Sequence, residues 1–177
     1  MRIRDKKSGR FSLNKAAYVL ECIDMSENRT LIAYATEGGT TEDYAKAISS
    51  ILTDEFKMQV ELVNLKKDRN PDLALYRKVI VGAGIRKFKM YKEGVEFLEK
   101  TSFGDRKVVI FISSLMPRDE VVKKYIDVIL QKNTELKPLA VEVLGGRMKI
   151  LGRTIQDKTD IEKAKTWARK IAEQLQS

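Results

Sequence analysis

Small hydroxyl and glycine residues follow a short apolar run near the start of the chain. The apolar run is Leu31–Ala35, and the stretch Thr36-Glu37-Gly38-Gly39-Thr40-Thr41 leads directly into a helical pattern that begins at Glu42. Glycines let a backbone turn tightly and bring its N–H groups near an anion, and the helix that follows directs its unpaired N–H groups at the same place. The three threonines add hydroxyl donors without adding charge. This pattern predicts a phosphate-binding loop over residues 36–41.

The same stretch indicates which kind of phosphate would bind. The nucleoside-triphosphate loop needs a lysine and a hydroxyl residue after its last glycine. This chain has no lysine there, and the two acidic residues Glu42 and Asp43 follow instead. Carboxylates at that position would repel a triphosphate, so a single phosphate monoester is the better match.

The residue inventory excludes several catalytic classes. The chain has no histidine and one cysteine, Cys22. A Ser-His-Asp or Cys-His arrangement is therefore excluded, a zinc or iron site of the usual type is not expected, and no internal disulfide can form. No residue is identified as a proton-transfer catalyst. Together with the lack of an apolar run long enough to span a bilayer, this predicts a cytoplasmic protein, with peripheral membrane contact as the alternative.

Apolar runs that suit strands alternate with segments of helical periodicity along the chain. Such alternation predicts an α/β fold with a parallel sheet and helices on both faces. Asn70-Pro71 is expected to open the short helical turn, and Thr159 and Glu162 form a capping box for the last helix. The expected strands are 30–35, 60–65, 79–83, 108–112 and 139–144, and the expected helical segments are 41–55, 70–76, 95–101, 117–129 and 159–175.

The phosphate loop resembles the flavodoxin pattern T/S-x-[T/S]-G-x-T, with Gly38 where most flavodoxins have a hydroxyl residue. In that superfamily the loop holds the 5′-phosphate of FMN. The resemblance implies a three-layer flavodoxin-like fold whose five-stranded parallel sheet has the order 2-1-3-4-5. In open α/β sheets, ligands bind beyond the carboxyl ends of the strands, where the strand order reverses, which here is beside the first and third strands.

Three stretches leave the relevant strands at that edge. The first is the phosphate loop, the second is the basic loop Gly84–Tyr91, and the third follows the fourth strand. In the resembled superfamily the flavin ring lies between the second and third loops. The resemblance therefore implies that FMN contacts Ala83, Gly84, Ile85, Arg86 and Lys87 in the second loop and Ser113, Ser114 and Leu115 in the third.

A longer stretch points to one branch of the superfamily. The segment Tyr76–Arg86 resembles the corresponding stretch of menaquinone-dependent protoporphyrinogen oxidase, a membrane-associated flavodoxin relative. Those oxidases carry a longer insertion before the last helix, whereas here only the basic segment Arg147–Lys158 fills that space. The branch is therefore an alternative interpretation.

The formal net charge is +9, which favours anionic partners. Arg86 is expected near the flavin, where a cation would stabilise the negative charge of the reduced ring and raise its potential above that of acidic flavodoxins. The competing explanation is that a chain of this charge has basic loops everywhere. Phe88 and Tyr91 are the candidates for stacking on the ring.

These observations leave three functions open. The first is an FMN protein that passes electrons between a donor and an acceptor, the second an FMN oxidase of an anionic substrate such as a porphyrinogen, and the third a binding module without cofactor. The expected partners are a redox protein, a quinone or a small anionic substrate, and no nucleic acid is expected. Residues 1–29 are expected to form a basic N-terminal extension and residues 30–177 the flavodoxin-like domain. The oligomeric state is left open.

Overall fold

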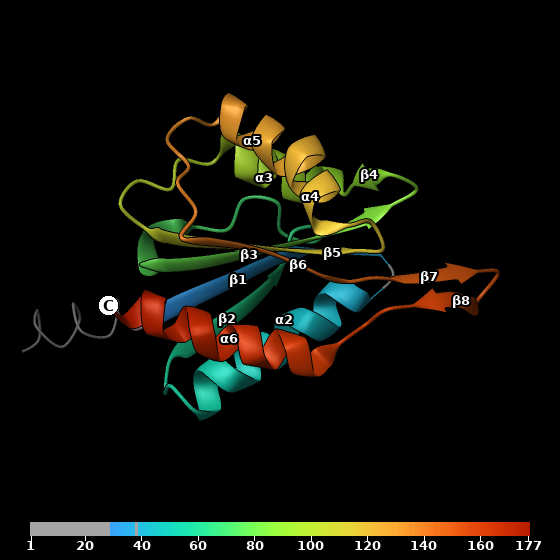
Figure 1. Cartoon of the computed structure of the whole chain (residues 1–177). Helices are drawn as coiled ribbons and strands as arrows, with labels where there is room; N and C mark the ends of the chain where they lie inside the picture. Colours follow the sequence, from blue (N-terminus) through green and yellow to red (C-terminus); the bar gives the residue numbers. More distant parts are fainter. Residues whose placement is uncertain (1–28, 38) are drawn as a thin grey trace, which may run out of the picture.

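The computed structural model of the chain describes residues 29–37 and 39–177. Five parallel strands form the centre of the molecule (Figure 1), and they follow the order β2-β1-β3-β5-β6. This order confirms the predicted sheet. Except for Arg29, the predicted N-terminal extension lies outside the described residues. The strands are β1 (Arg29–Ala35), β2 (Gln59–Asn64), β3 (Lys78–Arg86), β5 (Lys107–Ser114) and β6 (Ala140–Gly145).

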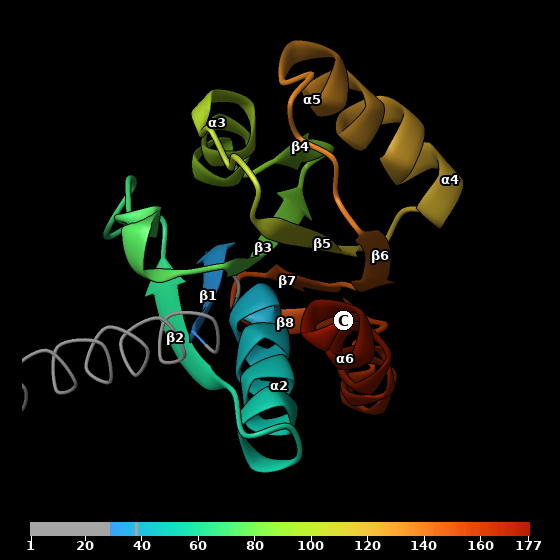
Figure 2. The ribbon, with the colours of Figure 1, turned by 90° about the vertical axis from the view of Figure 1, so that its left-hand side faces the viewer.

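Helices cover both faces of this sheet (Figure 2). Helices α2 (Thr40–Asp54) and α6 (Ile161–Gln176) lie together on one face. The other face carries α3 (Lys92–Lys100) and the helical stretch made of α4 (Arg118–Val121), the π-helical segment η2 (Val122–Ile126) and α5 (Asp127–Lys132).

The central strands are apolar on both faces because both faces are buried. Successive residues of β1 show this: Leu31 belongs to the core beneath α3 and α5, and Ile32 belongs to the core beneath α2 and α6. Both side chains are fully buried. Burial of apolar surface at about 25 cal/mol per Å² is the main force that holds such layers together.

The strand register brings the ends of the central strands to one level. Ala35 of β1 pairs with Ala83 of β3, and Gly84 of β3 pairs with Ser113 of β5. The residues that follow these positions therefore meet at a single edge of the sheet, which we call the carboxyl edge.

The second of the three predicted loops is a β-hairpin. Strand β3 runs on to Arg86, and the short strand β4 (Lys89–Met90) pairs back with it in antiparallel fashion. Lys87 and Phe88 make the turn with φ angles of 48° and 59°. Two positive φ values are typical of the type I′ turn, whose twist matches that of its flanking strands. From the sequence, a loop without the hairpin was expected over residues 84–91, because neither turn residue is the Asn or Gly that usually marks this turn.

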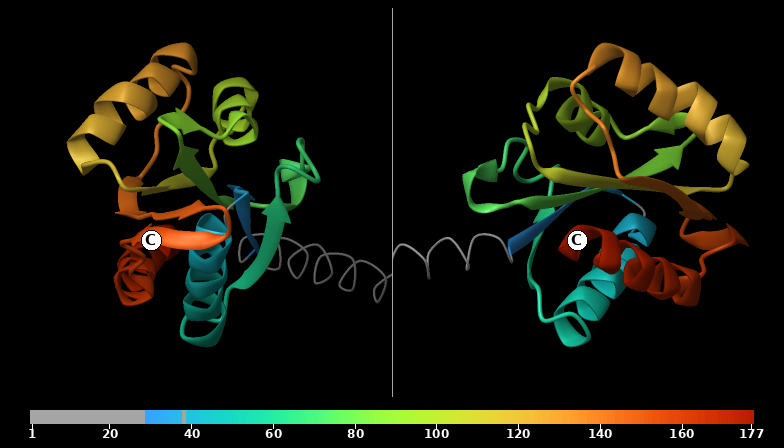
Figure 3. Two further views of the ribbon diagram at one scale, coloured as in Figure 1. Left: turned by 90° about the vertical axis from the view of Figure 1, so that its right-hand side faces the viewer. Right: turned by 60° about the vertical axis from the view of Figure 1, so that its left-hand side comes forward.

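A second hairpin occupies the segment that was expected only as a short basic connection. Strand β7 (Arg147–Ile150) and strand β8 (Arg153–Asp157) form a separate two-stranded sheet. Leu151 and Gly152 form its tip with φ angles of 47° and 78°. The hairpin projects beyond the main body at the carboxyl edge (Figures 1 and 3).

Two helix starts differ from the sequence-based expectation. The segment between β2 and β3 contains only the 3₁₀ turn η1 (Leu73–Leu75), which is capped by Asp72 and not by Asn70. Helix α6 is capped by Asp160, whose carboxylate accepts a hydrogen bond from the Lys163 amide at 2.8 Å. Asp160 takes this position because its own amide donates to the Tyr44 hydroxyl at 3.0 Å, so the predicted capping box from Thr159 is not formed.

Candidate functional site

The predicted phosphate loop connects β1 to α2 through a tight turn. Gly39 has a φ of 84°, and its amide donates to the Thr36 hydroxyl at 3.2 Å. Gly39 also holds the N-cap position of α2, where it has no side chain to bond the first helical amides. Those amides carry the positive end of the helix dipole, so they suit an anion. Gly38 lies outside the described residues.

A hydrogen bond joins the first predicted loop to the third. Thr41 Oγ1 and Ser113 Oγ lie 2.7 Å apart, and Thr41 is only 1% exposed. The two hydroxyls therefore fix the start of α2 to the end of β5. Thr40, the first residue of α2, is also buried.

The third predicted loop, Ser113–Leu115, is held by its own side chains. The Ser114 hydroxyl accepts a hydrogen bond from the Met116 amide at 2.9 Å. A Cβ on Gly146 would lie 2.8 Å from the Ser114 carbonyl carbon and 3.0 Å from the Leu115 amide nitrogen, so this neighbour must be a glycine. Both serines are buried and their hydroxyls shape the loop.

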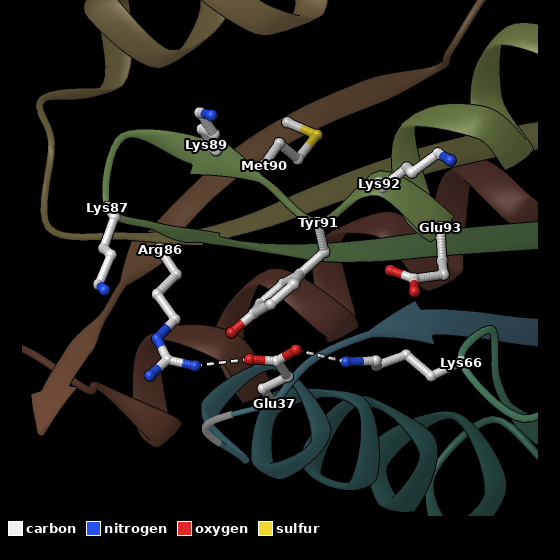
Figure 4. Close-up of a pocket in the computed structure, with 9 residues that line it drawn as sticks. All are labelled: Glu37, Lys66, Arg86, Lys87, Lys89, Met90, Tyr91, Lys92 and Glu93. Atoms are coloured by element: carbon white, nitrogen blue, oxygen red, sulfur yellow. Dashed lines mark hydrogen bonds and ion pairs between the residues drawn. The ribbon is translucent and has the colours of Figure 1, made fainter.

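Glu37 joins the first predicted loop to the second (Figure 4). One carboxylate oxygen lies 2.5 Å from Lys66 Nζ, and the other lies 2.5 Å from Arg86 Nη1. The hydrogen bond from Lys66 and then the one from Arg86 lower the pKa of Glu37 below its ordinary value. The carboxylate is thus charged at neutral pH and draws Arg86 toward the phosphate loop.

Glu37, Lys66 and Arg86 help to line a pocket of about 460 Å³. This volume is within the range of small-molecule sites. Its lining holds five cationic and two acidic side chains, which leaves three net positive charges. The residues are Glu37, Lys66, Arg86, Lys87, Lys89, Met90, Tyr91, Lys92 and Glu93 (Figure 4).

Tyr91 is the aromatic residue of this pocket. Its ring extends toward Glu37 (Figure 4), and Lys66 Nζ lies 5.7 Å from the ring centroid. The ring packs on Gly84, where a Cβ would lie 2.8 Å from Tyr91 Cε2 and 3.0 Å from Thr41 Oγ1. Gly84 is therefore needed for the close approach of β3, Tyr91 and the start of α2.

Phe88, the other candidate for ring stacking, lies at the tip of the β3–β4 hairpin. Its side chain is 71% exposed, and its carbonyl accepts a hydrogen bond from the Tyr125 hydroxyl at 2.5 Å. Lys124 Nζ lies 5.8 Å from the Phe88 ring centroid. Phe88 thus points away from the pocket lining and stays available at the surface.

The remaining residues of the second predicted loop serve different purposes. Ala83 is fully buried and packs against α3, because a Cβ on Gly94 would lie 2.9 Å from that of Ala83. Ile85 is partly buried and packs on the core. Only Arg86 and Lys87 of the residues 83–87 line the pocket.

Lys66 and Glu93 line the pocket although neither lies in a predicted loop, and Met90 lies in the predicted second loop but was not named as a contact. Lys66 follows β2, which pairs with β1, so the rule that ligands bind at carboxyl ends would have placed it beside the phosphate loop. Met90 lies in β4, and Glu93 lies in the first turn of α3. No group of three or more possible metal ligands occurs within residues 29–37 and 39–177.

The family model described as a flavodoxin domain matches residues 31–174. The chain belongs to the flavodoxin domain family. This match spans all three predicted loops and, apart from the outer ends of β1 and α6, the strands and helices described above. No curated protein matches the chain.

Solved flavodoxins share the fold. Oxidised flavodoxin 2 from Bacillus cereus is 24% identical, with a TM-score of 0.60, and the match covers 82% of this chain and 99% of that one. A flavodoxin from the domain Archaea is 16% identical, with a TM-score of 0.59 and coverage of 84% and 99%. The flavodoxin of Streptococcus pneumonia TIGR4 is 17% identical, with a TM-score of 0.57 and coverage of 82% and 99%. At these identities the likeness concerns the fold alone.

Proposed function

We propose that this flavodoxin domain binds FMN and transfers electrons between a donor and an acceptor. The observation that supports this most strongly is the convergence of three loops at the carboxyl edge, where Thr41 bonds Ser113 and Glu37 bonds Arg86. FMN, when bound, accepts and donates the electrons. The protein contributes position and electrostatics. Residues 30–177 form the domain in this proposal, and residues 1–29 form a basic extension.

The phosphate of FMN is assigned to the first loop. Thr36, Glu37, Gly38, Gly39, Thr40 and Thr41 make up this loop. The open backbone at Gly39, with no atom within 4 Å of a Cβ built there, leaves room for a ligand next to the first amides of α2. An anion at this position complements both the amides and the helix dipole.

The flavin ring is assigned to the space between the second and third loops. Tyr91 offers an aromatic face on the side of the second loop, and the pocket lining includes none of Ser113, Ser114 and Leu115. Arg86 and Lys87 supply positive charge. Glu37 pairs with Arg86 and compensates part of its charge. We therefore expect the net charge of the whole pocket to influence the redox potential of bound FMN more than Arg86 alone does. Among the described residues, no ion pair engages Lys87 or Lys89. Their uncompensated positive charge would stabilise the reduced flavin, which supports a redox potential above that of acidic flavodoxins.

The oxidase alternative is supported by one feature. Lys87, Lys89 and Lys92 line the pocket and suit the carboxylates of a small anionic substrate such as a porphyrinogen. Against an oxidase, only the segment 147–158 stands before the last helix, where the resembled oxidases carry a longer insertion. Electron exchange with a partner protein or a quinone needs no such insertion.

Three measurements separate the functions. A visible spectrum of the purified protein after addition of FMN distinguishes a flavoprotein from a module without cofactor. Reduction of the FMN-loaded protein and mixing with a quinone then tests electron transfer. Oxygen- or quinone-dependent oxidation of a porphyrinogen tests the oxidase alternative. Turnover in that assay would favour an oxidase over an electron carrier.

A further inference from the structure

Both hairpin turns at the carboxyl edge place an apolar side chain at their tip. Phe88 is 71% exposed and Leu151 is 99% exposed. The exposed Ile150 and Ile155 extend the apolar surface of the β7–β8 hairpin. Figure 3 shows both hairpins on the side of the molecule where the central strands end.

Neither apolar residue is the natural choice for its position in the turn. Phe88 and Leu151 have φ angles of 59° and 47°, a region that costs residues with a Cβ about 1–2 kcal/mol. Asn or Gly would fit both positions better. A bulky apolar side chain at an unfavourable and exposed position points to a contact made by that side chain.

Cations flank both tips. Lys87 and Lys89 stand on either side of Phe88, and Lys149 and Arg153 stand on either side of the turn at Leu151. The segment 147–158 as a whole carries four cations and one carboxylate, Asp157.

The acidic groups of this edge are largely compensated. Glu37 pairs with Lys66 and Arg86, while Asp43 and Asp157 both pair with Arg147. The carboxylates of Asp119 and Glu120 stand at the start of α4, where Asp119 pairs with Arg118 at 3.7 Å. The two tips themselves are apolar and positively charged.

We propose that the two hairpin tips dock the protein on an anionic lipid surface. Apolar side chains at a tip enter the boundary between headgroups and acyl chains, while cations just behind them bind anionic headgroups. A stable protein partner usually buries a continuous patch of about 800 Å² on each side. The tips are instead separate projections (Figures 1 and 3), which a fluid interface accommodates more readily.

The depth of insertion is limited to the tips. The outer edges of a two-stranded sheet carry unpaired backbone groups that cannot be buried in hydrocarbon. No helix among residues 29–37 and 39–177 is long and apolar enough to cross a bilayer. The inference deepens the proposed function, because it places the flavin edge toward the membrane and makes the electron partner a membrane component.

The test uses the full chain and co-sedimentation with vesicles of phosphatidylcholine alone or mixed with phosphatidylglycerol. Binding to the mixed vesicles and little binding to phosphatidylcholine alone are expected. Leu151→Asn should weaken binding at least about tenfold, since burial of a leucine contributes about 1.5–3 kcal/mol. The same substitution should raise the urea midpoint, because Asn suits the turn better than Leu. Loss of binding together with a raised urea midpoint would exclude misfolding as the cause.

Two matched variants control for general effects. Leu75→Asn removes an exposed apolar residue that precedes β3 at the opposite edge of the sheet and should leave vesicle binding unchanged. Lys149→Gln should weaken binding about fivefold, as expected for about 1 kcal/mol per cation, whereas Lys137→Gln at the opposite edge should have a much smaller effect.

Two results would overturn the proposal. One is the absence of binding to the mixed vesicles, which would make an acidic protein the better partner for this surface. The other is binding by Leu151→Asn as tight as that of the unchanged chain, which would attribute the attraction to charge elsewhere in the chain. FMN uptake is measured separately by absorbance, so a failure of lipid binding leaves the proposed function untouched.

Discussion

The carboxylate of Glu37 lies 2.5 Å from the guanidinium of Arg86, although the two residues come from different loops of the carboxyl edge. Glu37 belongs to the phosphate loop, and Arg86 is the last residue of β3. The same carboxylate also holds Lys66, which follows β2. One acidic side chain thus bridges the phosphate loop, the end of β3 and the segment after β2, and it offsets part of the positive charge around the proposed flavin ring.

This relationship predicts opposite effects of two substitutions on the redox potential of bound FMN. Arg86→Gln removes a cation and should lower the potential, while Glu37→Gln removes the compensating carboxylate and should raise it. A shift of about 20 mV in each direction corresponds to about 1 kcal/mol for a two-electron couple. A redox titration of the FMN-loaded protein measures both shifts.

The control for these two variants is Glu99→Gln. Glu99 pairs with Lys132 at 2.9 Å on the α3–α5 side of the sheet, so its loss should leave the potential unchanged. Shifts of the same sign in Arg86→Gln and Glu37→Gln would contradict the electrostatic explanation.

The hydrogen bond between Thr41 and Ser113 should couple the stabilities of two loops. Thr41→Val leaves the buried Ser113 hydroxyl without its partner, and Ser113→Ala does the same to Thr41. Each change should reduce the free energy of unfolding by about 1–3 kcal/mol. The double variant should lose less than the sum, because neither orphaned hydroxyl remains.

Urea unfolding of the four proteins in this cycle gives the coupling energy. Ser50→Ala provides the comparison, since the Ser50 hydroxyl donates to Asp54 at 2.8 Å on the exposed face of the same helix. Its effect should stay within about 0.5 kcal/mol. Strict additivity of Thr41→Val and Ser113→Ala would mean that the two hydroxyls do not bond in solution.

The base of the β7–β8 hairpin should loosen in acid. Thr159 is the main cause of a pKa of about 2 for Asp157: its hydroxyl lies near the carboxylate without forming a well-aligned hydrogen bond, and its amide donates to Oδ1 at 2.8 Å. Arg147 contributes a further bond at 2.7 Å. Because this pKa lies below the ordinary 3.8, the stabilisation is complete above about pH 4 and disappears as pH falls through about 2.

Hydrogen exchange of the hairpin amides provides the measurement. Asp157→Asn at neutral pH should reproduce the acid behaviour, with faster exchange in residues 147–158 and little change in the central strands. A matched change at a distant ion pair, Glu55→Gln, removes the partner of Arg169 and should not affect the hairpin. Equal protection of the hairpin in Asp157→Asn and the unchanged chain would show that this carboxylate does not hold the base.

The sheet could be predicted from the sequence because its strands are buried on both faces. Leu31–Ala35 and Val79–Ala83 are continuous apolar runs, and such runs between helical segments leave few alternatives to a parallel sheet. The phosphate loop was recognisable because its glycines and threonines stand at a strand–helix junction. These signals are local in the chain.

The two hairpins could not be predicted because three of their four turn residues are not the Asn or Gly that usually marks such a turn. Lys87-Phe88 and Leu151-Gly152 are not recognisable as turns from composition, since three of the four residues have a Cβ at positive φ. The roles of Ser113 and Glu37 also depend on partners far along the chain, at Thr41 and Arg86. Such pairings arise only when the sheet brings the loops together.

The most direct test of the account is a titration of the flavin-free protein with FMN and, in parallel, with riboflavin. Flavin fluorescence reports the bound fraction in both cases. If residues 36–41 hold the phosphate, FMN should bind with a stoichiometry of about one per chain, and riboflavin should bind at least tenfold more weakly because it lacks the phosphate. Failure to take up FMN, or equal affinity for the two flavins, would contradict the account.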